Sequence, residues 1–357
     1  MIEFEEYIEL LRSLIRVPAF SREEDAAADV LECWMRERGV DKVGDQLPMR
    51  RDGNNIILEQ KGRGDGRPVI LLNAHIDTVR PVASYTRDPF EPSVDGDVLY
   101  GLGSNDDGGS LVALLAAYLQ LVRTEQPYRL IYAATTEEEV CGREGIERVI
   151  PSFGPVALGI IGEPTRMQMA VAERGLMVLD CTALGKSGHA ARNEGVNAIY
   201  EALQSIDWFR NHKFPKVSDY LGPVNMNVTM ISAGTQHNVV PDKCSFVVDV
   251  RPNGMYTNPE LLSLICAAVP CEVKARSTRL GSSHISQEHP VVRKGLSMGL
   301  RAFGSPTCSN QTLCSFTTLK IGPGDSARSH TADEFIRLSE IREGIDIYVQ
   351  LLDNLEL

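Results

Sequence analysis

The stretch Arg129–Glu139, RLIYAATTEEE, joins an apolar run to two threonines and three consecutive glutamates. A short, nearly continuous apolar run is typical of a strand that is buried on both faces of a sheet. The three carboxylates repel one another, and they stand where this strand should leave the core. On a solvated helix they would be ordinary surface charge, so their position at a strand end indicates a chemical requirement for negative charge.

Strands of the same kind occur before and after this stretch and alternate with helices. We expect strands at 54–60, 68–74, 129–135 and 156–162, and helices at 3–17, 21–38 and 110–122. The second helix begins with Ser21 and Glu24, a capping-box pattern. Buried strands separated by helices predict an α/β fold with a mostly parallel sheet covered on both faces.

The pattern changes in the middle of the chain, where strands and helices follow one another in the order βαββαβ. The expected elements are 175–185, 197–211, 224–232, 243–251, 258–269 and 271–277. This order is that of the ferredoxin-like sandwich. We therefore expect an α/β domain formed by residues 1–173 and 284–357, interrupted by an inserted α+β domain at 174–283.

Composition limits the classes of function. The 357 residues carry a formal net charge of −12, which argues against a nucleic-acid partner because phosphate binding needs clustered lysine and arginine. No apolar run approaches the ~20 residues that span a bilayer, and the acidic, amphipathic N-terminus does not resemble a secretory signal. The eight cysteines are scattered without a CxxC pair, so we expect reduced thiols in a cytoplasmic protein.

Polar side chains collect at the ends of several expected strands, where ligands bind in open α/β sheets. His75 and Asp77 are two residues apart in NAHIDTV, so on an extended chain both side chains point the same way. Such a pair can bind one metal ion, or the carboxylate can orient the imidazole. A purely structural hydrogen bond between them is the alternative.

A glycine-rich loop, YGLGSNDDGGS, precedes the helix expected at 110–122. A dinucleotide fingerprint would need glycine at position 106, where this chain has Asp106, and two aspartates at a helix N-terminus would repel a pyrophosphate. The loop is therefore not a nucleotide site. A metal ligand fits it better, with helix-capping aspartates as the alternative.

Two more strand ends carry ligand-type residues. Glu163 follows a buried strand in IIGEPT, and His330 lies in the glycine- and proline-rich loop IGPGDSARSHTADEF. Two histidines with several carboxylates suit zinc, cobalt or manganese better than soft thiolate chemistry. A pair of such ions about 3.5–4 Å apart can share a bridging carboxylate.

Seven motifs together resemble the dinuclear zinc amidohydrolase family, which includes acetylornithine deacetylase, succinyl-diaminopimelate desuccinylase and aminoacylase. They are the H-x-D pair, the glycine-rich loop with its aspartate, the glutamate pair, GEPT, GKSGHAA, HNVVP and the late GPG…SH. They occur in order along nearly the whole chain. GEPT and GPGDSARSHTADEF most resemble the acetylornithine deacetylase branch.

The resemblance implies a hydrolytic enzyme with two divalent metal ions, zinc with cobalt or manganese as alternatives. Asp106 would bridge the two ions. The remaining ligands would be His75 and Glu163 on one ion, and Glu139 and His330 on the other.

Two further acidic residues act in this family without binding metal. By the resemblance, Asp77 orients His75, and Glu138 is the general base that takes a proton from the metal-bridging water and delivers it to the leaving amine. Many relatives have Met-Lys-Gly-Gly after the bridging aspartate, whereas this chain has Asp107-Gly108-Gly109. Asp107 is thus an alternative ligand, and we favour Asp106 for its spacing from the preceding glycines.

The inserted segment resembles the family's dimerisation or lid domain. His189, in GKSGHAA, resembles the histidine that reaches across a homodimer interface to stabilise the oxyanion. Asn238 and Arg251 resemble residues that hold the substrate's α-carboxylate. A solvated surface position is the alternative for His189 and for Arg251.

The resemblance implies hydrolysis of the amide bond of an N-acyl amino acid, of the N-acetyl- or N-succinyl-ornithine or citrulline class, in arginine biosynthesis. Arg328 or Lys186 would hold the distal carboxylate of a succinyl group, unless Arg328 pairs with Asp325 or Asp333 to brace its loop. Alternatives are succinyl-diaminopimelate desuccinylase, a general aminoacylase, a dipeptidase, and a metal-binding protein without turnover. The complete set of ligand and base positions argues against the last.

Overall fold

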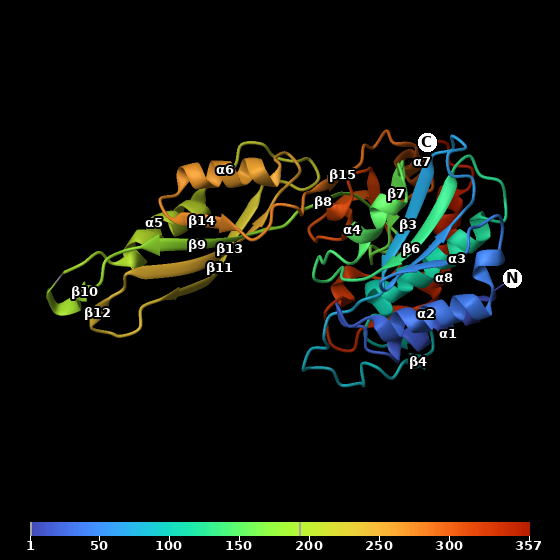
Figure 1. The fold of residues 1–357 in the computed structure, drawn as a ribbon, viewed down its shortest axis with the longest axis horizontal. Coiled ribbons are helices and arrows are strands. Elements are labelled where there is room, and N and C mark those ends of the chain that lie inside the picture. The colour runs from blue at the N-terminus through green and yellow to red at the C-terminus, as the bar shows by residue number, and fades with distance from the viewer. Residues whose placement is uncertain (1, 193) are drawn as a thin grey trace. The chain divides into compact units, whose positions relative to one another are not determined.

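The computed structural model describes residues 2–192 and 194–357 and divides into two compact units (Figure 1). Unit 1 comprises Met1–Val171, His284–Phe303 and Ser309–Leu357, and unit 2 comprises Ala172–Ser283 and Gly304–Cys308. Each unit has its own sheet and hydrophobic core. None of the described helices is long and apolar enough to cross a membrane.

Unit 1 is built on a mixed sheet with the strand order β1-β2-β6-β3-β7-β17-β8, and β15 and β16 complete its β8 edge. The strands are β1 (Arg50–Asp52), β2 (Asn55–Glu59), β3 (Val69–His75), β6 (Arg129–Thr135), β7 (Leu158–Ile161), β8 (Met169–Glu173), β15 (Ser283–His284), β16 (Ala302–Ser305) and β17 (Thr318–Lys320). The four central strands are parallel. The α/β fold is confirmed, but the β1–β2 hairpin and β8 add antiparallel strands at the edges, so the sheet is mixed.

Alternate residues of β6 explain how both faces of this sheet are covered. Ile131 and Ala133 join a core cluster on one face, while the hydroxyl of Tyr132 donates to the Leu111 carbonyl at 3.1 Å on the other. The second face belongs to α3, which is buried almost all round, as its apolar sequence predicts. α3 packs on β3 and β6, and also on α1 and α8. The helices of unit 1 are α1 (Phe4–Ile15), α2 (Asp25–Glu37), α3 (Gly109–Leu121), α4 (Ile146–Val149), α7 (Pro290–Ser297) and α8 (Leu338–Leu352).

The predicted capping box at Ser21 is wrong. α2 begins at Asp25, and its N-cap is Glu24. The Ser21 hydroxyl donates instead to the Asp77 carboxylate at 2.7 Å. A long-range charge-assisted hydrogen bond to a buried carboxylate is stronger than a local cap, so the serine stays outside the helix.

A small sheet brings two loops of unit 1 together. Its strands β4 (Ser93–Asp95), β5 (Val98–Tyr100) and β18 (Phe335–Arg337) lie in the order β18-β5-β4. β5 ends where the glycine-rich loop begins, and β18 follows the loop that contains His330. Their pairing places Phe335 opposite Tyr100, so the glycine-rich loop begins beside the point where the His330 loop ends.

Unit 2 has the ferredoxin-like topology that the sequence predicts. Its sheet is antiparallel throughout, with the order β11-β13-β9-β14. The elements are β9 (Met177–Leu184), α5 (Ala198–Asn211), β11 (Asn225–Ala233), β13 (Lys243–Arg251), α6 (Asn258–Ala268) and β14 (Glu272–Ala275), with a short pair β10 (Gly188–His189) and β12 (Val239–Val240). Alternate residues of β9 and β13 are buried in one core with α5 and α6.

Candidate metal centre

The central strands of unit 1 deliver polar side chains to one edge of the sheet. β3 ends at His75, β6 ends three residues before Glu138, and β7 ends two residues before Glu163. Because these strands are parallel, their carboxyl ends meet at the same edge. The loop after β17 carries His330 to the same place, as its contacts below show.

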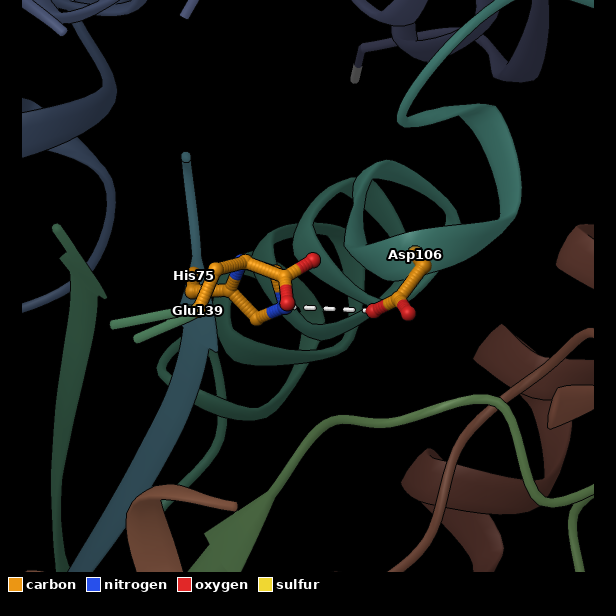
Figure 2. A group of neighbouring side chains, drawn as sticks. All are labelled: His75, Asp106 and Glu139. Atoms are coloured by element: carbon orange, nitrogen blue, oxygen red, sulfur yellow. Dashed lines mark hydrogen bonds and ion pairs between the residues drawn. The ribbon is translucent and has the colours of Figure 1, made fainter. Parts of the chain in front are cut away.

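The Asp106 carboxylate lies between two imidazole rings. Its Oδ1 is 3.2 Å from His75 Nε2, and its Oδ2 is 3.7 Å from His330 Nε2. Figure 2 shows the Asp106 carboxylate facing the His75 ring, with the Glu139 side chain beside that ring. Glu139 also lies 3.0 Å from His330 Nε2. One carboxylate thus presents an oxygen atom to each of two histidines.

Glu138 and Glu163 extend this group to six side chains, which we call the metal centre. Two sets of potential ligand atoms each lie within 4.8 Å of one another: His75, Asp106 and Glu139, and His75, Glu138 and Glu163. Both sets contain His75, and Asp106 also faces His330, so the ligand atoms form one continuous cluster. The predicted side chains of unit 1 therefore converge.

Burial makes the ionised form of this cluster energetically unfavourable in the absence of cations. Burial raises the pKa of Glu138, Glu139 and Glu163, and neighbouring carboxylates add to the rise. Burial alone would lower the pKa of His75, but its hydrogen bonds to Asp106 and Asp77 raise it well above its usual range. A hydrogen bond to Glu139 raises the pKa of His330 to about 9. Imidazole with carboxylate is the donor set that zinc-like ions prefer, and such cations would offset the buried negative charge.

Asp77 organises the centre without facing the ligand atoms. The His75 Nδ1 donates to the Asp77 carbonyl at 2.8 Å, so the lone pair of neutral His75 is on Nε2, which faces Asp106. The Asp77 carboxylate accepts the backbone N–H groups of Glu138 and Glu139 at 3.0 and 3.1 Å. It therefore fixes the direction in which the chain carries both glutamates. Sequence reasoning found only the link between Asp77 and His75.

Asp107 contacts the backbone of His75. Its Oδ2 accepts the backbone N–H of His75 at 3.3 Å, and burial raises its pKa to about 7. Asp106, not Asp107, has its carboxylate between the imidazoles. The peptide bond that joins the two aspartates is cis.

Glu334 and Asn105 support Asp106, and sequence reasoning missed both. The Glu334 carboxylate accepts the backbone N–H groups of Gly103, Asn105 and Asp106 at 3.0, 2.9 and 2.9 Å. The Asn105 side chain donates to the Asp325 carbonyl and accepts its N–H, which ties the glycine-rich loop to the His330 loop. The proximity of Glu334 to His330 in the sequence was the only signal.

Arg328 is occupied by an ion pair. Its guanidinium binds Glu340 through two hydrogen bonds of 2.7 and 3.0 Å and lies over the Phe335 ring. Neither sequence-based interpretation named this partner. Because a bidentate pair fixes the guanidinium, Arg328 braces its loop, and we assign it no contact with substrate.

The three predicted residues of unit 2 do not form one group within that unit. His189 on β10 is exposed, and the next residue donates its N–H to the Asn238 carbonyl at 3.0 Å. Arg251 ends β13 and pairs with Asp249 at 2.8 Å. The nine-residue strand β13 is about 27 Å long. Arg251 lies at its last residue, whereas Asn238 lies in the segment that precedes its first residue.

Comparisons with known proteins agree with the fold and show the family. The profile of peptidase family M20/M25/M40 matches residues 71–354. The chain belongs to this family. The resemblance inferred from the motifs is confirmed, and this M20-family chain is a metal-dependent hydrolase.

Curated relatives and solved structures match over the full length. Acetylornithine deacetylase of Pectobacterium carotovorum subsp. carotovorum is 28% identical, with 97% of each chain covered. That of Proteus mirabilis is 28% identical over 99% of this chain and 97% of its own. Aminopeptidase PepT of Bacillus cereus has a TM-score of 0.76 at 18% identity, with 98% of each chain covered. A dinuclear metal binding peptidase of the M20 family from Bacillus subtilis has a TM-score of 0.71 at 16% identity, over 98% of this chain and 97% of its own.

The role of Asp77 predicts that Asp77→Asn weakens metal binding. Asparagine keeps the shape but offers one acceptor oxygen where the carboxylate accepts from two glutamate N–H groups and a serine hydroxyl. We expect the affinity for at least one ion to fall about 10- to 100-fold, measured by zinc titration of the metal-free protein against a chelator. Asp346→Asn, an exposed change on α8, is the control. Equal zinc affinities in both variants would contradict this role.

Proposed function

We propose that this protein hydrolyses the amide bond of an N-acyl amino acid with two divalent metal ions, zinc by preference and cobalt or manganese as alternatives. One observation carries the proposal: the two oxygens of Asp106 face the Nε2 atoms of His75 and His330. A carboxylate that offers one oxygen to each of two imidazoles is the arrangement that a bridged ion pair needs.

The side chains around Asp106 suit two separate ions. We assign His75 and Glu163 to one, and Glu139 with His330 to the other. The 3.0 Å contact between Glu139 and His330 supports the second assignment. Bound at this centre, two divalent ions would lower the pKa of a water molecule and polarise the carbonyl of the amide.

Glu138 is the proposed general base. Its carboxylate lies 3.9 Å from His75 Nε2, at the edge of the ligand cluster, and its backbone N–H is held by Asp77. Burial and the nearby Glu163 raise its pKa, which suits a group that must both accept and release a proton near neutral pH. Glu138 takes the proton of the attacking water and gives it to the leaving nitrogen.

The proposed substrate is an N-acetyl- or N-succinyl-ornithine or citrulline, with a place in arginine biosynthesis. Support comes from the curated relatives named acetylornithine deacetylase, which match nearly the whole chain. Peptidases among the solved structures make a dipeptide the second candidate, beside succinyl-diaminopimelate and general N-acyl amino acids. Among the residues that the structure describes, no disulfide joins any of the eight cysteines, which supports the cytoplasm as the proposed location.

A homodimer would complete the site. Asn238 and Arg251 lie at opposite ends of unit 2, so one copy of this unit cannot bring both to a single substrate carboxylate. A second copy could supply His189 and Asn238 to the oxyanion and the carboxylate. The edge strand β11 has unpaired backbone on one side and exposes Met230 and Ile231, which suits pairing with another copy. We therefore propose dimerisation through unit 2.

Substitution of the two adjacent glutamates should separate base from ligand. Glu138→Gln should lower kcat about 10²- to 10⁴-fold and keep both ions, because only the proton carrier is lost. Glu139→Gln removes a proposed ligand, so the affinity for one ion should fall by more than about 100-fold. Loss of a residue that only hydrogen-bonds to a ligand typically costs less than this. Metal content by elemental analysis and amide hydrolysis at saturating zinc measure these effects. Full activity of Glu138→Gln would refute the assigned mechanism.

A substrate panel tests the proposed chemistry. N-acetyl and N-succinyl derivatives of ornithine and citrulline should be hydrolysed with a kcat/KM at least about 100-fold above that for dipeptides. Arg328→Met should change kcat/KM for the acetyl and the succinyl substrates by the same factor, because Arg328 binds Glu340 and not the acyl group. Glu138→Gln serves as the control for contaminating hydrolases. Faster cleavage of dipeptides would assign the protein to the peptidases of its family.

A further inference from the structure

Glu24 is a buried carboxylate that holds the backbone directly before the glutamate pair. It is 2% exposed and is the N-cap residue of α2, yet its side chain caps no N–H group of that helix. Its Oε1 accepts instead the backbone N–H of Arg22 at 2.7 Å and that of Glu137 at 3.2 Å. A capping side chain normally accepts from the first turn of its own helix. Glu24 therefore joins two segments that are 113 residues apart in the sequence.

The two residues that Glu24 holds both have a left-handed backbone. The angle φ is 75° at Arg22 and 56° at Glu137. This conformation is unfavourable for residues other than glycine, so it persists only where the surrounding contacts hold it. One oxygen atom of Glu24 provides such a contact to both residues. Because Glu137 directly precedes Glu138 and Glu139, its backbone conformation sets the direction in which the chain enters that pair.

The segment Ser21–Glu24, which we call the N-terminal clamp, has a second contact with the same turn. The Ser21 hydroxyl donates to Asp77 Oδ2 at 2.7 Å. This oxygen also accepts the N–H of Glu139, and Oδ1 of Asp77 accepts the N–H of Glu138. Carboxylates thus hold the N–H groups of all three consecutive glutamates. One of these carboxylates lies within the clamp, and the other is bound to it.

We propose that Glu24 is a positioning residue for the general base, and that it acts by fixing the backbone of Glu137 and hence the direction of Glu138. The inference rests on the proposed function, since it assumes that Glu138 moves the proton and that Glu139 binds one ion. The reach of Glu24 matters more than its charge, because a single oxygen atom makes both contacts.

Three substitutions separate the reach of this side chain from its charge. Glu24→Asp keeps the charge and a favourable N-cap residue, but it withdraws the oxygen atoms by one methylene group from the N–H of Glu137. Glu24→Gln keeps an acceptor oxygen at the same distance and removes the charge. Glu23→Gln is the matched control, because Glu23 is the neighbouring acid and forms an exposed ion pair with Arg80.

Glu24→Asp should impair the turn while substrate still binds. With N-acetyl-ornithine, kcat should fall about 10- to 100-fold and KM should stay within about threefold of wild type, because a small displacement of a catalytic group slows the chemical step. Chelator competition should show that the zinc affinity of one ion falls about 10-fold, because Glu139 lies in the same turn. The visible spectrum of the cobalt-loaded protein should change for the same reason.

The other two variants should keep the wild-type properties. Glu24→Gln should retain kcat and both zinc affinities within about threefold, with the cobalt spectrum of wild type, because its oxygen still reaches the N–H of Glu137. Glu23→Gln should match wild type in every measurement.

Two results would overturn the inference. One is a Glu24→Asp variant with the kcat, zinc affinities and cobalt spectrum of wild type, whatever its unfolding temperature, since Glu24 would then only stabilise the fold. The other is an equal loss in Glu24→Gln and Glu24→Asp, since the charge would then matter and not the position of one oxygen. A wild type that binds no ions and hydrolyses none of the amides in the substrate panel would instead refute the proposed function itself.

A further variant keeps the test decisive if Glu24→Asp does not fold. Glu24→Met removes the acceptor with an apolar side chain of similar volume, a change that buried charged positions often tolerate. It should show the loss of kcat and the altered cobalt spectrum that we expect of Glu24→Asp. Wild-type values in Glu24→Met would overturn the inference equally.

Discussion

Four carboxylates converge on a buried space at the edge of the unit 1 sheet, and this crowding of negative charge governs the rest of the site. Asp106, Glu138, Glu139 and Glu163 come from a loop and two strand ends, and burial raises the pKa of the three glutamates. Each buried, ionised carboxylate costs several kcal/mol of stability unless a cation accompanies it. The site is therefore stable in its charged form only with positive charge at its centre.

Two further carboxylates fix the backbone that carries these side chains. Asp77 accepts the N–H groups of Glu138 and Glu139, and Glu334 accepts three N–H groups of the loop that carries Asp106. Hydrogen bonds of this kind are charge-assisted and hold the backbone without entering the ligand space. The backbone therefore keeps Asp106, Glu138 and Glu139 close together, and cations at the centre would offset the repulsion among their carboxylates.

Much of this arrangement could be predicted from the sequence. Apolar runs that end in His75, the Glu138–Glu139 pair and Glu163 mark strand ends, and parallel strands bring such ends together. The order βαββαβ likewise specified the topology of unit 2. These features follow from periodicity and order, which a single sequence displays.

The supporting contacts could not be predicted in this way. The pairing of Arg328 with Glu340 and the capture of Ser21 by Asp77 join loops to distant elements, and no periodic pattern specifies them. Spacing from the preceding glycines already favours Asp106 over Asp107 as the ligand, whereas the contact of Asp107 with the His75 backbone could not be predicted.

The most direct measurement of the central claim is anomalous diffraction at the zinc edge from crystals of the zinc-loaded protein. The account predicts two peaks about 3.5–4 Å apart, one on each side of the Asp106 carboxylate, with His75 next to one and His330 next to the other. A single peak, or peaks that do not contact Asp106, would contradict it.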